Sequence, residues 1–361
     1  MLSDQDLSNQ LADLNVPYLD QSVADSGVLK SVSQRDGVVS VEIELGFPCA
    51  GAHAQWADAV RSRLQANDGV DSVEVRIGTR VQAHAVQRTL KRLKSVKNII
   101  AVASGKGGVG KSTTACNLAL ALASDGARVG ILDADIYGPS QPRMMGVSGR
   151  PDSPDGKSIE PKIAYGVQVM SIGFMVDDDT PVVWRGPMVT GALQQLLNET
   201  NWQALDYLVV DMPPGTGDLQ LTLSQQVPVA GAVIVTTPQD IALLDARKGL
   251  KMFEKVEVPV LGIVENMSIH ICSSCGHKEP IFGQGGGERM ASDYNVRFLG
   301  GLPLDIHIRE QADGGAPTVI ADPDGSIAES YREIARAMSA ALSRRARDFS
   351  ANFPKIVIEN T

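Results

Sequence analysis

The chain has few cysteines, few aromatic residues and no long apolar run. Its 361 residues include only four cysteines, and aromatic residues make up 4% of the composition. So few cysteines in a chain of this length exclude a small secreted fold held together by disulfides. No stretch of about 18 or more apolar residues offers a membrane-spanning helix. The first residues, Met1 to Asp6, are acidic and lack the charged-then-apolar order of a signal peptide, so we expect a cytoplasmic protein.

Positive charge is also scarce. The formal net charge is −9, which argues against a dedicated nucleic-acid binder because no broad basic surface is available to neutralise phosphates. The one basic stretch, RTLKRLKSVK at 88–97, is interpreted as a solvated linker, with a local nucleic-acid or membrane patch as the alternative. We therefore expect neither nucleic acid nor a membrane as a partner.

What the chain does contain is a glycine-rich loop between a predicted strand and a predicted helix. An apolar run at 98–104 is followed by GKGGVGKST, which fits the P-loop template G-x-x-x-x-G-K-[ST]. In this motif backbone N–H groups and a helix N-terminus face the phosphates, the lysine reaches the β and γ phosphates, and the first hydroxyl is placed for Mg²⁺. The predicted nucleotide-binding residues are Gly105, Lys106, Gly107, Gly108, Val109, Gly110, Lys111, Ser112 and Thr113, with Ser112 also a predicted Mg²⁺ ligand.

From residue 98 onward, predicted strands and helices alternate, which favours a mostly parallel α/β sheet with helices on both faces. Polar residues follow several of these strands. Asp133 and Asp135 follow the strand after the P-loop helix, Asp211 ends the apolar run LDYLVVD, and Asn266 follows VLGIVE. Ligands of open α/β sheets bind where the strands end. Asp211 is therefore a predicted Mg²⁺ residue, because hard cations prefer oxygen ligands.

Lys106 is a second lysine, near the start of the P-loop, where an ordinary P-loop needs no charge. With it the chain resembles the deviant Walker A family, which includes the ParA and MinD ATPases and the nitrogenase iron protein. The resemblance implies a nucleotide-sandwich homodimer in which Lys106 contacts the phosphates of the partner subunit. It also implies that Lys106, Lys111 and Asp135 are catalytic, with Asp135 orienting the attacking water. By the same resemblance Asp133 lies near the Mg²⁺, and Asn266 binds adenine, which favours ATP.

Two further cysteines, Cys272 and Cys275, form a C-x-x-C pair flanked by His270 and His277. Such a pair can be a redox couple, part of a zinc site or two ligands of an iron–sulfur cluster. A redox couple needs a strand-to-helix junction, whereas this pair precedes a glycine-rich loop at 283–287. A cluster usually takes four thiolates, which a symmetric dimer would supply. Zinc bound with both histidines, or a metal-free loop, stays open.

The first 85 residues have the predicted order helix, strand, helix, strand, and they resemble the small iron–sulfur-assembly domain found in front of Mrp-type ATPases. Cys49 lies where that domain often carries a reactive cysteine, although a lone cysteine is more often inert packing. Together with the P-loop and the C-x-x-C pair, this makes the chain resemble the Mrp/ApbC iron–sulfur carriers. We expect a small α+β domain at 1–85, a linker at 86–97, a P-loop NTPase domain at 98–345 and a tail at 346–361.

The Mrp/ApbC resemblance implies an ATPase, slow or dependent on a partner, that uses ATP and Mg²⁺. It further implies a 4Fe-4S cluster bridging Cys272 and Cys275 of two subunits. The expected partners are a second copy of the chain, apo iron–sulfur proteins and cluster scaffold proteins. Two alternatives stay open: a ParA/MinD-like positioning ATPase with a structural zinc at the C-x-x-C pair, and a reductase like the nitrogenase iron protein, whose cysteines come from separate loops.

Overall fold

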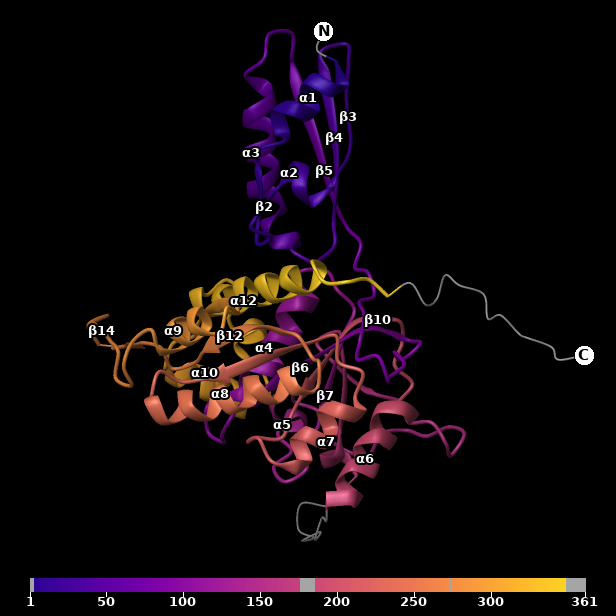
Figure 1. The fold of residues 1–361 in the computed structure, drawn as a ribbon, viewed down its shortest axis with the longest axis vertical. Coiled ribbons are helices and arrows are strands. Elements are labelled where there is room, and N and C mark those ends of the chain that lie inside the picture. The colour runs from indigo at the N-terminus through magenta and orange to yellow at the C-terminus, as the bar shows by residue number, and fades with distance from the viewer. Residues whose placement is uncertain (1–2, 176–185, 273, 349–361) are drawn as a thin grey trace, which may run out of the picture.

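The computed structural model describes residues 3–175, 186–272 and 274–348. It contains a small N-terminal unit and a larger unit built on an eight-stranded sheet. In Figure 1 the N-terminal unit lies at one end of the molecule, next to the C-terminal helix α12 (Ser326–Ser343). Each unit has its own cluster of buried apolar residues, and Ala340 of α12 belongs to the cluster of the N-terminal unit.

The N-terminal unit is a three-stranded sheet in the order β3-β4-β5, covered by helices. Its elements are α1 (Asp4–Leu11), β1 (Asn15–Val16), β2 (Gln21–Ser22), α2 (Val23–Ser26), β3 (Leu29–Arg35), β4 (Val38–Leu45), the 3₁₀ turn η1 (Ala50–Ala52), α3 (His53–Gln65) and β5 (Ser72–Thr79). The predicted order of helix, strand, helix and strand corresponds to α1, β4, α3 and β5, but the prediction omitted β3. Asp36 and Gly37, both at positive φ, form the two-residue turn that joins β3 to β4.

The larger unit confirms the predicted α/β sheet. Seven of its eight strands are parallel, and β8 alone runs antiparallel at one edge. In spatial order the strands are β15 (Phe298–Gly301), β12 (Val260–Glu265), β11 (Gly231–Thr236), β6 (Val96–Ala103), β10 (Leu205–Asp211), β7 (Val129–Asp133), β9 (Val167–Ser171) and β8 (Lys162–Ala164). Every residue of β7, β10, β11 and β12 is buried, as expected for strands covered on both faces.

Helices cover both faces of this sheet. They are α4 (Lys111–Ser124), α5 (Gln141–Met144), α6 (Gly186–Glu199), α7 (Asp218–Gln226), α8 (Asp240–Lys255), α9 (Gly286–Asp293), α10 (Ile306–Asp313), α11 (Thr318–Ala321) and α12, with a 3₁₀ turn η2 (Ile172–Phe174). Right-handed crossovers place α4 on the face opposite α7 and α8. The helix α12 packs against α4 on its face, and α8 packs against α9 on the other.

The strand register brings the predicted acidic residues together. In the parallel pairing of β10 with β7, Asp211 lies opposite Asp133, and β6 pairs with the other side of β10. The P-loop leaves the end of β6 at this same edge. Because all three strands run in the same direction, their carboxyl ends lie at one edge of the sheet, which is where open α/β sheets bind ligands.

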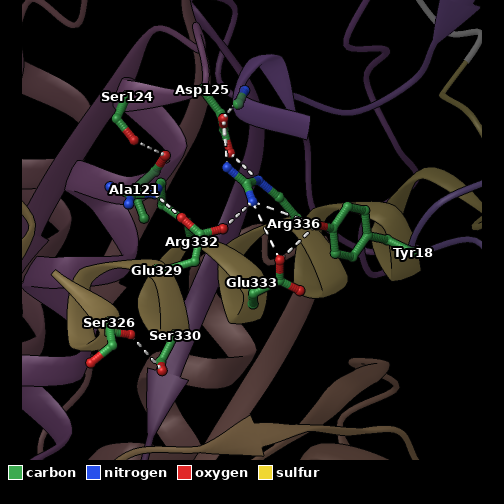
Figure 2. A network of polar contacts seen from close by, with 11 residues as sticks. Tyr18, Ala121, Ser124, Asp125, Ser326, Glu329, Ser330, Arg332, Glu333 and Arg336 are labelled. Carbon is green, nitrogen blue, oxygen red and sulfur yellow. Dashed lines mark hydrogen bonds and ion pairs between the residues drawn. The ribbon is translucent and has the colours of Figure 1, made fainter. Parts of the chain in front are cut away.

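A buried ion pair of the larger unit lies where the two units meet (Figure 2). Arg336 of α12 is 3% exposed, and its Nε and Nη2 donate to the two carboxylate oxygens of Asp125 at 2.6 and 3.2 Å. Asp125 is the C-cap residue of α4, and it also accepts from the backbone N–H of Gly51 at 2.8 Å. On the outer side of Arg336, the Tyr18 hydroxyl donates to Glu333 at 2.9 Å. The far end of the P-loop helix is thus tied to the N-terminal unit.

The segment between the two units is anchored along its length. Strand β6 begins at Val96, two residues before the predicted domain start, and the preceding stretch contacts the end of the described chain. Arg92 pairs with Asp348 at 3.1 Å, and His84 forms a bridge with Arg347. The first residues of the predicted tail therefore cover the predicted linker, while residues 349–361 lie outside the described part.

Candidate nucleotide and metal sites

The P-loop connects β6 to α4, and its backbone requires glycine at two close approaches. Gly110, the N-cap of α4, has φ of 79°, and a Cβ there would lie 2.1 Å from Nδ2 of Asn266. At Gly105 a Cβ would lie 2.1 Å from the backbone carbonyl carbon of Asp245 in α8. The loop is thus fixed from two sides, with the N-terminus of α4 open to a ligand, which is the arrangement that binds phosphate.

Lys111 lies at the centre of the site. Its side chain is 6% exposed, and its ammonium group pairs closely with Asp211 and lies 3.8 Å from Asp135. It also donates to the Ser112 hydroxyl at 3.1 Å. The structure therefore brings together four residues predicted from three separate segments: Lys111 and Ser112 of the P-loop, Asp135 and Asp211.

Asp133 is fully buried beside Asp211 and anchors the loop that carries Asp135. Its carboxylate accepts from the backbone N–H groups of Asp135, Ser140 and Gln141 at 2.9–3.1 Å. The Ser171 hydroxyl donates to it at 3.1 Å. Burial and the charge of Asp211 raise the pKa of Asp133 to about 7. With four donors already on its two oxygens, Asp133 holds both ends of loop 134–140 here, and its contact with Mg²⁺ stays a prediction.

Asp135 is partly buried at the start of this loop. Burial raises the pKa of Asp135, while the charge of Lys111 acts in the opposite direction. Tyr137, two residues further on, is 65% exposed. The loop therefore presents a buried carboxylate toward the P-loop and an exposed aromatic ring toward solvent.

Lys106 lies within the P-loop, and Asn266 contacts that loop from the end of β12. Within the described residues Lys106 has no ion-pair partner, and its carbonyl accepts from the Ser104 hydroxyl at 2.8 Å. Asn266 is 7% exposed, and its Nδ2 donates to the carbonyl of Val109 at 2.9 Å. Asn266 thus supports the P-loop backbone directly, and its predicted contact with adenine stays a prediction.

Gln141, the first residue of α5, is part of the site but was not among the predicted residues. It is fully buried, and its Nε2 donates to Asp211 Oδ2 at 2.9 Å and to the carbonyl of Ser112 at 3.0 Å. The one indication in the sequence is that Gln141 directly follows the string DADIYGPS. A glutamine at this position belongs to no phosphate-binding motif, so the sequence pattern did not single it out.

The C-x-x-C pair lies in a small hairpin that follows β12. The strands β13 (His270–Ile271) and β14 (Lys278–Glu279) are antiparallel, and Cys272 exchanges backbone hydrogen bonds with Gly276 and His277 at 2.8 and 2.9 Å. Cys272 is partly buried and Cys275 is exposed. Hydrogen bonds from the backbone of Ser274 and Cys275 and from the Cys275 side chain lower the pKa of Cys272. This favours the thiolate, the form of cysteine that binds metals.

The histidines beside the pair do not complete a metal site in this conformation. Nδ1 of His270 lies 3.2 Å from the carbonyl of Leu304. Across residues 3–175, 186–272 and 274–348, no three or more side chains of histidine, cysteine, aspartate or glutamate are grouped so that they could hold a metal ion. A single chain therefore offers two neighbouring thiols, and a four-ligand site needs ligands from elsewhere.

Cys49, in contrast to Cys272 and Cys275, is buried among apolar residues. It is 2% exposed in the core of the N-terminal unit, and burial together with the charge of Asp125 raises its pKa to about 12. A thiol with this pKa is protonated at neutral pH, which makes it a poor nucleophile and a poor metal ligand. In this structure Cys49 acts as core packing.

The sheet, the glycine loop leading into α4 and the acid at the end of β10 define a P-loop NTPase. Comparison of the sequence with known protein families identifies the family within this class. Residues 95–339 match the family model described as "NUBPL iron-transfer P-loop NTPase", and residues 4–77 match "Iron-sulfur cluster assembly protein". The chain belongs to the NUBPL iron-transfer P-loop NTPase family, which confirms the resemblance to iron–sulfur carriers.

Curated relatives agree over most of the chain. An "Iron-sulfur cluster carrier protein" of Escherichia coli strain K12 is 51% identical over 93% of this chain and 91% of its own length. The protein with the same description from Pseudomonas fragi is 64% identical over 74% of this chain and 94% of its own. The "Iron-sulfur cluster transfer protein NUBPL" of Mus musculus is 53% identical over 68% of this chain and 77% of its own.

A solved structure supports the fold of the larger unit. A nucleotide-binding protein of Archaeoglobus fulgidus in complex with ADP is 37% identical, with a TM-score of 0.56. The match covers 65% of this chain and 91% of that protein. Among the helices that the structure describes, none is long and apolar enough to cross a membrane.

Proposed function

We propose that this protein is an iron–sulfur cluster carrier whose ATPase cycle controls a cluster held between two copies of the chain. The observation that carries the proposal is the pairing of a complete P-loop site with a two-thiol hairpin on the same subunit. The curated relatives are described as iron–sulfur cluster carrier or transfer proteins, which supports an iron–sulfur cluster as the cargo. The recipients would be apo iron–sulfur proteins, and scaffold proteins would supply the cluster.

The residues at the P-loop fit a nucleotide with Mg²⁺. The N-terminus of α4, Lys111 and Lys106 offer positive charge to phosphates, and Ser112 and Asp211 are the oxygen donors that would hold Mg²⁺. Bound Mg²⁺ would neutralise charge on the phosphates. Asp135, held within reach of Lys111, is the carboxylate placed to orient a water. We infer that ATP is the nucleotide and that Asn266 contributes to the adenine site.

The thiol pair fits a cluster shared by a dimer. Cys272 and Cys275 are accessible to a second chain, and one subunit brings only two thiols to the hairpin. Two subunits related by a two-fold axis supply the four thiolates that a 4Fe-4S cluster takes. The same axis would place Lys106 of each subunit near the nucleotide of the other, which links nucleotide state to the arrangement of the cysteines.

The positioning ATPase is the less favoured alternative. A structural zinc with His270 and His277 is not assembled in the described hairpin. The apolar face of α12 is buried, with Tyr331, Ile334 and Met338 each at most 1% exposed. It packs against α4, so this helix has no apolar face free for a membrane.

The decisive experiment is anaerobic reconstitution of the full chain with iron and sulfide, followed by metal counts and sedimentation. We expect about two irons and two sulfides per subunit in a dimer, as a shared four-iron cluster requires. Cys272→Ala should lose the iron and keep ATP binding, and Lys111→Ala should lose ATP binding. Cys49→Ala, the matched cysteine control, should keep both. Stoichiometric zinc without sulfide, or full iron in Cys272→Ala, would overturn the proposal.

A further inference from the structure

Gln141 connects three parts of the nucleotide site through one side chain and one backbone group. Its backbone N–H donates to Asp133 at 3.0 Å, and its Nε2 donates to both Asp211 and the carbonyl of Ser112. The residue is fully buried. It therefore contacts the start of α4, the end of β7 and the end of β10 without access to solvent.

The carboxylate of Asp211 is divided between two partners. Oδ1 pairs with Lys111, and Oδ2 accepts from Gln141 at 2.9 Å. If Lys111 turned toward the phosphates of a bound nucleotide, it would release Oδ1 of Asp211, whereas the amide of Gln141 would still hold Oδ2. The amide thus fixes the orientation in which the freed oxygen faces the P-loop.

The oxygen of the Gln141 side-chain amide, unlike its nitrogen, makes no hydrogen bond within the described chain. Oε1 is buried and has no hydrogen-bond partner in the parts of the chain that the structure describes. Burying an amide oxygen without a partner is unfavourable, so such a group usually serves a ligand or an ordered water. Since both hydrogens of Nε2 are engaged, the orientation of the amide is fixed, and Oε1 is a fixed acceptor next to the group that contacts Asp211.

We propose that Gln141 is a positioning residue for the hydrated Mg²⁺: its N–H group orients Asp211, and its Oε1 accepts from a water bound to the metal. The proposal rests on the proposed function, in which Asp211 serves Mg²⁺. It goes further by explaining how the metal acts on loop 134–140. Gln141 follows that loop and shares Asp133 with it, so a shift of Asp211 on metal binding passes to the segment that carries Asp135.

The test uses Gln141→Met in the full chain, because methionine keeps the length and volume of glutamine and removes the amide. ATP hydrolysis is measured against Mg²⁺ concentration, and binding of ATP is measured separately in excess EDTA. We expect the half-saturating Mg²⁺ concentration to rise about 10-fold, as is typical when a group that orients a metal ligand is lost. The affinity for metal-free ATP should change by less than about two-fold.

Gln87→Met is the matched control, because Gln87 is also a buried glutamine, but the hydrogen bonds of its amide within the described chain go to Ser224, Val227 and Val229. This variant should keep the wild-type Mg²⁺ requirement. If Gln141→Met does not fold, Gln141→Asn keeps an amide but is too short to reach both partners, and it should show the same shift. If Gln141→Met keeps the wild-type Mg²⁺ requirement, or if its affinity for ATP falls equally with and without Mg²⁺, the proposed role of Gln141 is wrong. If the wild-type protein shows no Mg²⁺-dependent ATP hydrolysis, the proposed function itself is wrong.

Discussion

Replacing Arg336 with methionine should destabilise the protein far more than removal of a surface charge. The change removes two hydrogen bonds to Asp125 and leaves that carboxylate, which is 3% exposed, with the Gly51 N–H as its remaining described donor. Burial alone would lower the pKa of Arg336, but the hydrogen bonds and charge of Asp125 outweigh it and raise the pKa. The guanidinium therefore stays charged at every accessible pH.

The contacts in Figure 2 set the size of the effect. Hydrogen bonds to a charged partner contribute about 1.5–3 kcal/mol each, so the two to Asp125 account for roughly 3–6 kcal/mol. The contact with Glu329, whose side chain is 45% exposed, adds at most about 1 kcal/mol because solvent screens it. Breaking one partner of a buried pair typically costs about 3–5 kcal/mol. We expect the free energy of unfolding to fall by about that amount.

Urea denaturation followed by circular dichroism measures this loss. Lys251→Met is the matched control, since Lys251 pairs with Glu254 at 2.7 Å but is 59% exposed, and it should cost less than about 1 kcal/mol. In the double variant Asp125→Leu with Arg336→Met, part of the stability should return because no buried charge is left unpaired. The return is partial because the Gly51 N–H loses its acceptor. If Arg336→Met costs no more than the control, the buried ion pair does not stabilise the protein as described.

Three further predictions follow from the site and its surroundings. Iodoacetamide at pH 8 should label Cys272 and Cys275 within minutes and Cys49 only after denaturation, as checked by mass spectrometry of peptides; rapid labelling of Cys49 would contradict its burial and its raised pKa. Burial lowers the pKa of His84, so the unfolded chain binds its proton more readily and the free energy of unfolding should fall as pH drops below about 6.5. His84→Gln should remove a slope of up to about 1.4 kcal/mol per pH unit, and an identical pH profile would contradict this. Lys106→Ala should keep ATP binding but lose ATP-dependent dimerisation in sedimentation; dimers that persist would place the partner contact elsewhere.

Local patterns predicted the parts of the fold that depend on neighbouring residues. The apolar run ending in Asp211 corresponds to β10. β3 was missed because its serines and lysine weaken the apolar alternation, although the Asp36–Gly37 turn signals a hairpin.

Contacts between distant residues could not be predicted in this way. Asp125 and Arg336 are separated by 211 positions, and neither belongs to a motif. Gln141 was missed for the same reason, since its partner Asp211 lies 70 positions away. The P-loop residues could be predicted because all residues of that motif come from one short segment, and their contacts with phosphate stay a prediction. A side chain that supports a site from another element leaves no such spacing in the sequence.

The charges at the site explain why nucleotide, metal and a second subunit would act together. Asp135 and Asp211 lie beside Lys111, and Asp133 lies opposite Asp211, so acidic groups outnumber the one buried ammonium that the described site contains. Burial, and after it the charge of Asp211, raises the pKa values of Asp133 and Asp135. A triphosphate adds further negative charge, and Lys111 cannot balance both the phosphates and Asp211. In the proposed dimer, Mg²⁺ beside Asp211 and Lys106 of a second subunit would supply the missing positive charge. Dimerisation would then depend on the γ-phosphate, and the cysteine hairpins would meet in only one nucleotide state.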